Sequence, residues 1–169
     1  MRAHALPMML GMRTLRPRSD ASCDCSEKLP WVPFAPHSDQ VHLKYYKIDP
    51  VRGEIVASMR IEPGAQLPTH YATDTMIIHT LRGAWRDIEH DWVSRAGDTV
   101  YETAGSPHTP ATVGDEESET FLILVGELEF VDEHGTLVAR ENWETAMARY
   151  EAYCAAHGIQ PVDLTSFED

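Results

Sequence analysis

Short strand-like runs separated by turn residues are the feature of this sequence that most limits how the chain can fold. Between residues 41 and 138 such runs recur about every ten residues, and Gly, Pro, Asp or Asn residues punctuate the series. No helical pattern stands between them, so neighbouring strands pair with one another rather than alternate with helices. The sequence therefore predicts an all-β sandwich or barrel. The expected strands span residues 41–48, 54–61, 75–81, 83–88, 99–102, 120–125, 128–131 and 136–138.

A helical pattern follows the last expected strand. From Asn142 onward, apolar and aromatic side chains recur three or four residues apart, which places them along one face of a helix. Glu141 or Asn142 stands near its start, and Gly158 supplies a stop signal. We expect an amphipathic C-terminal helix that packs on the sheets of the same chain or on a neighbouring subunit. The stripe contains Trp143, Ala146, Met147, Tyr150, Tyr153 and Cys154.

The length of the chain and a change in its character indicate one domain. A chain of 169 residues buries a sufficient core as a single unit. Residues 1–30 are rich in Arg, Ser and Asp and have no periodic pattern, so we expect a flexible leader there. Residues 31–140 then form the β domain, residues 141–158 the helix and residues 159–169 a tail.

The charge distribution narrows the class of partner. The net charge is −13, and residues 31–169 carry nine Lys/Arg against 24 Asp/Glu. An acidic domain repels nucleic-acid phosphates and anionic membrane surfaces. We therefore expect neither nucleic acid nor a membrane as a partner, and we expect a ligand that is neutral, cationic or bound through a metal.

The apolar runs and the cysteines bear on the cellular compartment. No apolar run reaches the ~20 residues of a membrane span. The three cysteines do not make a closed disulfide set, since Cys23 and Cys25 are separated by one residue and Cys154 falls in the helical stripe. This usage is typical of a reducing compartment, and we expect the protein in the cytoplasm.

Two histidines stand in matched contexts. His70 follows Pro68-Thr69, and His108 follows Pro107, so each lies just beyond a Gly/Pro turn at the start of a strand. A barrel can direct a side chain inward from such a position. Imidazole is a common ligand of divalent metals, and the two histidines are therefore candidate metal ligands.

The spacing around these histidines resembles the two sequence motifs of the cupin superfamily. Gly64, His70 and Gly83 fall on positions of the first motif, and Gly97, Gly105 and His108 fall on positions of the second, without a gap. The resemblance implies a single cupin domain, which is a double-stranded β-helix or jelly-roll barrel, with a metal at its histidines.

The chain departs from the family pattern at two usual ligand positions. Ala72 stands where the second histidine of the first motif is expected, and Met76 stands at the glutamate position. Two histidines hold a divalent ion poorly without a third protein group. We expect Glu102 as that group, because the 102–108 hairpin would bring it beside His108. The alternatives are Asp74, His79 and Glu89.

The flanking residues are similar to a narrower group, the cupin dioxygenases that cleave 2,4′-dihydroxyacetophenone, which are relatives of the acetylacetone-cleaving enzymes and of an anti-sigma-factor sensor domain. The similarity spans roughly residues 31–158 and includes the segments 83–93 and 105–109. It implies a non-haem Fe(II) dioxygenase that takes O₂ and cleaves a C–C bond in a small hydroxyketone or β-dicarbonyl. The pocket wall expected from this fold comprises Met59, Met76, Ile78, Trp85 and Tyr101.

Two other functions remain open at the level of sequence. One is a non-redox isomerase or lyase that uses Zn, Mn or Ni. The other is a non-catalytic binding or sensing cupin with a weakened metal site, which the loss of ligands at Ala72 and Met76 favours. Relatives of this kind usually associate, so we expect a homodimer or homotetramer.

Overall fold

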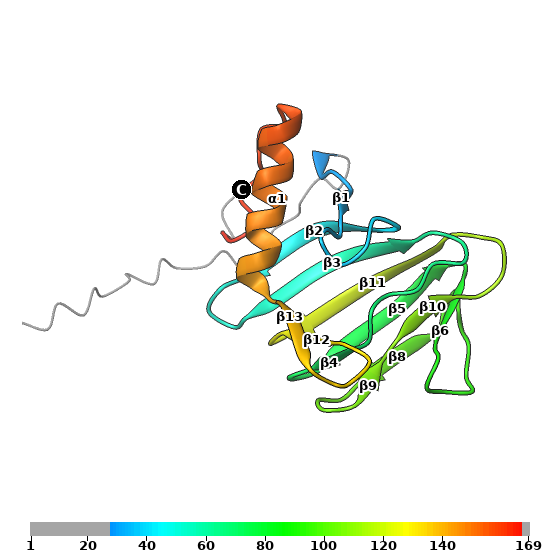
Figure 1. Ribbon diagram of the computed structural model, residues 1–169. Coiled ribbons are helices and arrows are strands. Elements are labelled where there is room, and N and C mark those ends of the chain that lie inside the picture. The colour runs from blue at the N-terminus through cyan, green and yellow to red at the C-terminus, as the bar shows by residue number, and fades with distance from the viewer. Residues whose placement is uncertain (1–27, 167–169) are drawn as a thin grey trace, which may run out of the picture.

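The computed structural model describes residues 28–166. In that range the chain forms thirteen strands followed by one α-helix (Figure 1). The expected leader lies almost wholly outside the described residues, as do Cys23, Cys25 and residues 167–169.

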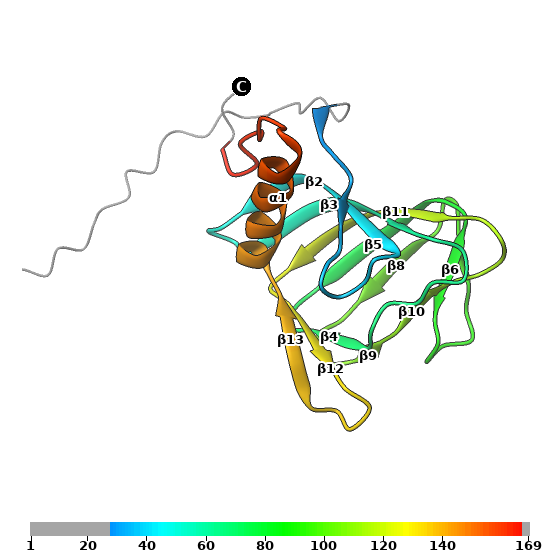
Figure 2. The same cartoon turned by 45° about the horizontal axis from the view of Figure 1, so that its top comes forward.

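The strands make three antiparallel sheets that enclose the core (Figures 1 and 2). The largest sheet has the order β1 (Val32–Pro33), β2 (Val41–Asp49), β3 (Glu54–Ile61), β11 (Ser118–Val125), β5 (Met76–Arg82) and β8 (Thr99–Glu102). The second has the order β10 (Pro110–Thr112), β6 (Ala84–Asp87) and β7 (Ser94–Arg95). The third has the order β13 (Leu137–Glu141), β12 (Leu128–Val131), β4 (His70–Ala72) and β9 (Pro107–His108). The arrangement is a jelly roll whose sheets are not joined into a closed cylinder, and the predicted fold class is confirmed.

The long strands follow the side-chain alternation on which the prediction rests. In β11, Ser118, Thr120, Leu122 and Leu124 are buried, while their neighbours are partly exposed. Because β11 pairs with both β3 and β5, its inward side chains lie at the centre of the largest sheet. Five strands were not predicted, namely β1, β4, β7, β9 and β10, and each has only two or three residues. Strands this short show no measurable period, yet β4 and β9 carry His70 and His108.

Helix α1 (Trp143–His157) begins and ends where its local signals stand. The Asn142 side chain accepts hydrogen bonds from the backbone N–H groups of Glu144 and Thr145, and Thr145 Oγ1 accepts one from the Asn142 N–H. This reciprocal pair is a capping box. Gly158 ends the helix in the left-handed conformation, with φ of 65°.

One face of α1 packs on the sheets of its own chain, against β1, β2 and β13 (Figure 2). Its buried residues are Ala146, Tyr150 and Cys154, spaced four residues apart. The described residues contain no other α-helix, and α1 lacks the length and apolar character that a membrane-spanning helix requires.

Candidate metal centre

The pairing of β4 with β9 brings the two predicted histidines together. His70 and His108 are direct partners in this antiparallel ladder, so their side chains lie on the same face of the sheet. That face is the interior, where the two residues are 2% and 4% exposed. Their ring centroids are 6.4 Å apart.

Two buried carboxylates face His108 from neighbouring strands. Asp87, at the end of β6, lies with its Oδ2 2.8 Å from His108 Nδ1. Glu102, at the end of β8, places its Oε1 3.8 Å from the same nitrogen. Asp87 is 0% and Glu102 2% exposed. Three of their four oxygens, Asp87 Oδ1 and both of Glu102, have no hydrogen-bond partner, and such orphaned buried acceptors are costly unless a cation or a donor meets them.

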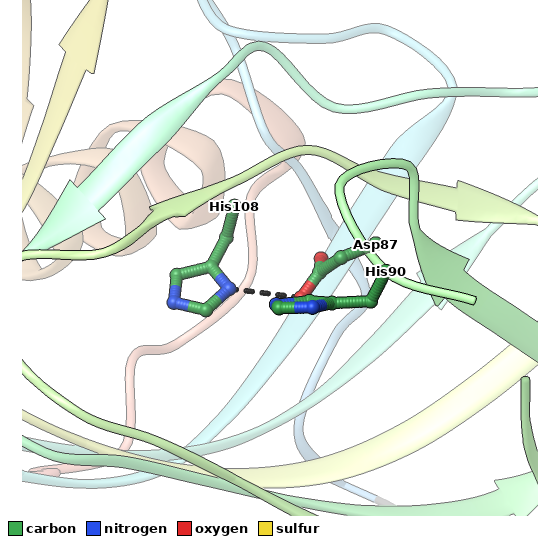
Figure 3. Close-up of side chains that lie close together, drawn as sticks. All are labelled: Asp87, His90 and His108. Atoms are coloured by element: carbon green, nitrogen blue, oxygen red, sulfur yellow. Dashed lines mark hydrogen bonds and ion pairs between the residues drawn. The ribbon is translucent and has the colours of Figure 1, made fainter. Parts of the chain in front are cut away.

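A third group, His90, completes the cluster. It stands in the loop after β6 and is exposed. One potential ligand atom from each of Asp87, His90 and His108 lies within 4.8 Å of the others. Figure 3 shows the three side chains converging, with the hydrogen bond between His108 and Asp87 dashed. Two imidazoles and a carboxylate are a donor set that suits a divalent transition metal.

Burial and neighbouring charges shift the pKa values of Glu102, His108 and His70 in different directions. Burial raises the pKa of Glu102 to about 7, and repulsion by Asp87 adds to this while the nearby His108 opposes it. Burial disfavours the charged form of His108, but the hydrogen bond that its Nδ1–H donates to Asp87 and the charges of Glu102 and Asp87 outweigh this effect, so the pKa of His108 is raised. Burial lowers the pKa of His70, which keeps its ring neutral.

Replacing Glu102 with glutamine should stabilise the metal-free protein at alkaline pH. The folded state raises the pKa of Glu102 from an ordinary 4.5 to about 7, so the free energy of unfolding falls as the pH rises between these values. A shift of this size corresponds to about 3 kcal/mol above pH 7. Urea denaturation at pH 5 and pH 8 with a chelator present should therefore show a loss of stability in the parent that is smaller in Glu102→Gln, where His108, whose pKa is also raised, still contributes. The exposed Glu133 provides the control, since Glu133→Gln should change neither value; equal stability of parent and Glu102→Gln at pH 8 would contradict the prediction.

Two of the usual ligand positions of the family hold no metal ligand in this chain. Ala72 is buried one position beyond Tyr71 on β4, and Met76 is buried at the start of β5. Met76 is, however, the direct partner of Glu102 across β5 and β8. The carboxylate of Glu102 therefore points into the interior from β8, whereas the family places its glutamate on the neighbouring strand β5.

Of the three alternative ligands, Asp74 and His79 lie away from the cluster, and the carboxylate of Glu89 is bound to Thr109. Asp74 is exposed and accepts a hydrogen bond from the N–H of Thr75. His79 points to the outer face, where its Nδ1 is 2.9 Å from Thr99 Oγ1. Glu89 accepts hydrogen bonds from the N–H and the hydroxyl of Thr109, so it supports the residue next to His108.

An internal cavity and an open pocket lie beside the cluster, and each is lined by some of the predicted pocket residues. An internal cavity of ≈ 40 Å³ is lined by Met59 and Met76, among others. An open pocket of ≈ 470 Å³ is lined by Tyr101 together with His90, Trp92, Thr99, Val100, Glu102, Thr103, Ser106 and His108. Ile78 and Trp85 are buried in the core and line neither hollow; the Trp85 indole donates to Thr80 Oγ1.

Asp87 and His90 were not predicted as site residues. Both fall in the segment 83–93 that carries the family resemblance. Asp87 also lies two residues beyond the buried Trp85 on β6, and this parity was a signal that its side chain points inward. No local signal distinguishes His90, because its place in the cluster depends on its approach to His108, which is remote in sequence, with ring centroids 6.4 Å apart.

Comparisons with known proteins identify the family. The model of the ChrR cupin-like domain matches residues 19–139. An RmlC-like cupin protein from Ralstonia eutropha JMP134, known from its crystal structure, is 47% identical with a TM-score of 0.84, and the match covers 88% of this chain and 96% of that one. An acetylacetone dioxygenase from Acinetobacter johnsonii is 15% identical with a TM-score of 0.70, covering 81% of this chain and 94% of that one, which is a likeness of fold alone.

No curated protein matches the sequence significantly. The match of the family model over most of the chain and the 47% identity to a solved cupin agree with the motif spacing around His70 and His108. The predicted membership of the cupin superfamily is thereby confirmed. The chain belongs to the ChrR cupin-like domain family.

Proposed function

We propose that this protein is a metal-dependent cupin enzyme that holds a divalent cation between Asp87, His90 and His108. The observation that carries the proposal is the set of three buried carboxylate oxygens without a hydrogen-bond partner on Asp87 and Glu102, the two acidic residues that face His108. A buried pair of carboxylates is stable only when charge or hydrogen bonds compensate it. A cation in place of the proton that His108 and Asp87 share would compensate the negative charge of these carboxylates. Glu102 would then provide a further carboxylate close to the ion.

The donor set supports Fe(II) as the ion, with Zn, Mn and Ni as alternatives. Two histidines and one carboxylate are typical of non-haem Fe(II) oxygenases, which keep positions open for substrate and O₂. A bound ion of this kind supplies Lewis-acid stabilisation of an enolate and a site for O₂.

The open pocket supports a small neutral carbonyl compound as the substrate. Its volume of ≈ 470 Å³ is in the range of small-molecule sites. None of its lining residues is Lys or Arg, so an anionic substrate would have no ammonium or guanidinium group to pair with in the pocket. Trp92 and Tyr101 offer ring faces for a planar molecule. A hydroxyketone or β-dicarbonyl meets all three conditions.

Glu102 is suited to accept a proton from such a substrate. Its carboxylate lies at the base of the open pocket, and its pKa of about 7 is close to the value at which a general base works best near neutral pH. The proton of an enolisable carbonyl would pass to Glu102, while the ring of Trp92 would hold the substrate plane at the pocket mouth.

The metal content of variants tests the proposed site. Protein produced in iron- and zinc-supplemented medium should contain close to one metal per chain by elemental analysis, and His90→Ala should lose most of it. His79→Ala is the matched control, because His79 lies on the outer face. Far less than one metal in the parent protein would remove the basis of the proposal.

The variant His70→Ala distinguishes the proposed metal position from a second one, between His70 and His108. The Nδ1 atoms of His70 and His108 face the Pro68 carbonyl and Asp87. The Nε2 atoms are then the candidate ligands, and that of His108 lies 3.1 Å from Ser106 Oγ, which an ion at this position would displace. Loss of metal in His70→Ala with retention in His90→Ala would place the ion between these nitrogens and contradict the proposed set.

O₂ uptake by the iron-loaded protein with hydroxyacetophenones and β-diketones then tests the reaction, and metal retention without O₂ uptake would favour a non-redox enzyme.

A further inference from the structure

An apolar cavity lies inside the jelly roll, behind the metal cluster. Its volume is ≈ 40 Å³, and every residue that lines it is buried. The walls come from the inward faces of the largest sheet, including Leu43 on β2, Ala57 and Met59 on β3, and Leu122 and Leu124 on β11. The volume is about a quarter of the ~150 Å³ of an engineered apolar cavity that accommodates benzene or xenon. There is room for a diatomic molecule or one noble-gas atom, and none for a ketone.

The polar groups on the cavity wall have partners elsewhere. Both oxygens of Glu141 accept hydrogen bonds from Arg149, and the Tyr45 hydroxyl accepts another from Arg149. His70 is the remaining polar residue of the lining, and its Nδ1 is bonded to the Pro68 carbonyl. A buried water needs two to four polar partners. A site that offers one nitrogen therefore favours an apolar occupant over water.

One end of the cavity adjoins the candidate metal centre. His70 lines the cavity and is the ladder partner of His108. Met76 also lines it and is the ladder partner of Glu102. Two side chains thus separate the apolar space from the cluster, whereas the open pocket reaches the cluster from the other side through His90, Glu102 and His108.

We propose that this cavity is a binding site for a small apolar gas, and that in the working enzyme the gas is O₂. The assignment of O₂ rests on the proposed oxygenase function, while the capacity to bind gas rests on the cavity alone. In this arrangement the two substrates approach from opposite sides, because the carbonyl compound occupies the open pocket and O₂ is held behind His70 and Met76.

Xenon binding tests the site without any reaction. A crystal of the metal-free protein pressurised with xenon should show one xenon atom between Ala57, Met59 and Leu122, and ¹²⁹Xe NMR should detect the same site in solution. Ala57→Val fills the cavity and should abolish xenon binding. Ala65→Val is the matched control, because Ala65 is equally buried but does not line the cavity. Absence of xenon from the cavity of the parent protein would overturn the inference, and this measurement needs no variant to fold.

Oxygen kinetics test the assignment of O₂. In iron-loaded protein, Ala57→Val should raise the KM for O₂ about tenfold, the order of effect that a methyl-sized change has in an apolar pocket, with kcat at saturating O₂ unchanged. An unchanged KM for O₂ would overturn the role of the cavity in the reaction. Xenon in the cavity of a protein that consumes no O₂ would support the gas site and refute the oxygenase function, so the two proposals fail separately.

Discussion

Replacing His108 with alanine should lower the affinity for a divalent metal by more than about 100-fold. His108 is the group that the cluster shares, since its Nδ1 is 2.8 Å from Asp87 and 3.8 Å from Glu102. Loss of an outer-shell partner of a metal ligand alone costs about 10–100-fold in affinity, and loss of a ligand exceeds this. Of the proposed ligands only Asp87 and His90 would remain, and one carboxylate with one imidazole is too few protein ligands to hold a transition metal tightly.

Thermal or urea denaturation with added metal measures this effect. At a free metal concentration of 100 times the Kd, binding stabilises the parent by about 2.7 kcal/mol, and a 100-fold weaker site would leave about 0.4 kcal/mol. His108→Asn is the companion variant, because its amide can still donate to Asp87 and so preserves the packing. A metal-induced stabilisation of His108→Asn equal to that of the parent would contradict the assignment of His108.

Replacing Arg149 with alanine should destabilise the fold by about 3–5 kcal/mol. Arg149 extends from α1 and binds both carboxylate oxygens of Glu141 on β13, at 2.6 and 2.5 Å. It also donates to the Ala35 carbonyl and to the Tyr45 hydroxyl, each at 2.8 Å. Its guanidinium lies 4.9 Å from the centre of the Phe34 ring. The truncation would leave Glu141, which is 3% exposed, as an unpaired buried charge.

The free energy of unfolding from urea titrations measures the loss, with two variants for comparison. Arg140 forms ion pairs with Glu127 and Glu129 while its side chain is 52% exposed, so Arg140→Ala should cost about 1 kcal/mol or less. The double variant Glu141→Gln with Arg149→Met removes both charges and should cost less than Arg149→Ala alone. Equal effects of Arg140→Ala and Arg149→Ala would show that the buried pair does not hold the helix in place.

The pH dependence of stability provides an independent check on this pair. Burial alone would raise the pKa of Glu141, but the hydrogen bonds from Arg149 and His37 and the charge of Arg149 outweigh it, so the pKa is lowered. The stabilisation is therefore complete above the ordinary glutamate pKa of about 4.3 and is lost as the pH falls through the lowered value. The parent should lose stability over this range, and the double variant should lose less of it.

Local pattern was sufficient to predict the long elements. The eight expected strands correspond to β2, β3, β5, β6, β8, β11, β12 and β13, with boundaries that differ by a few residues. The helix begins after Asn142 and ends at Gly158, where its capping signals stand. The alternation of buried side chains and the helix caps depend on residues a few positions apart, so both can be predicted from the sequence without knowledge of the fold. The spacing of Gly64, His70, Gly97 and His108 likewise identified the family.

Tertiary structure decided the composition of the site. Sequence spacing placed His70 and His108 in similar turns, but only the β4–β9 ladder makes them partners. Asp87 and His90 join His108 because β6 pairs with β10, the strand that follows His108 some twenty residues later in the chain. The raised pKa of Glu102, the apolar cavity behind His70 and the open pocket at His90 all depend on how several strands pack against one another. Burial and proximity of this kind are properties of the assembled sheets, so the sequence alone determined the jelly roll and its two histidines, and the packing of the strands selected the carboxylates that face them.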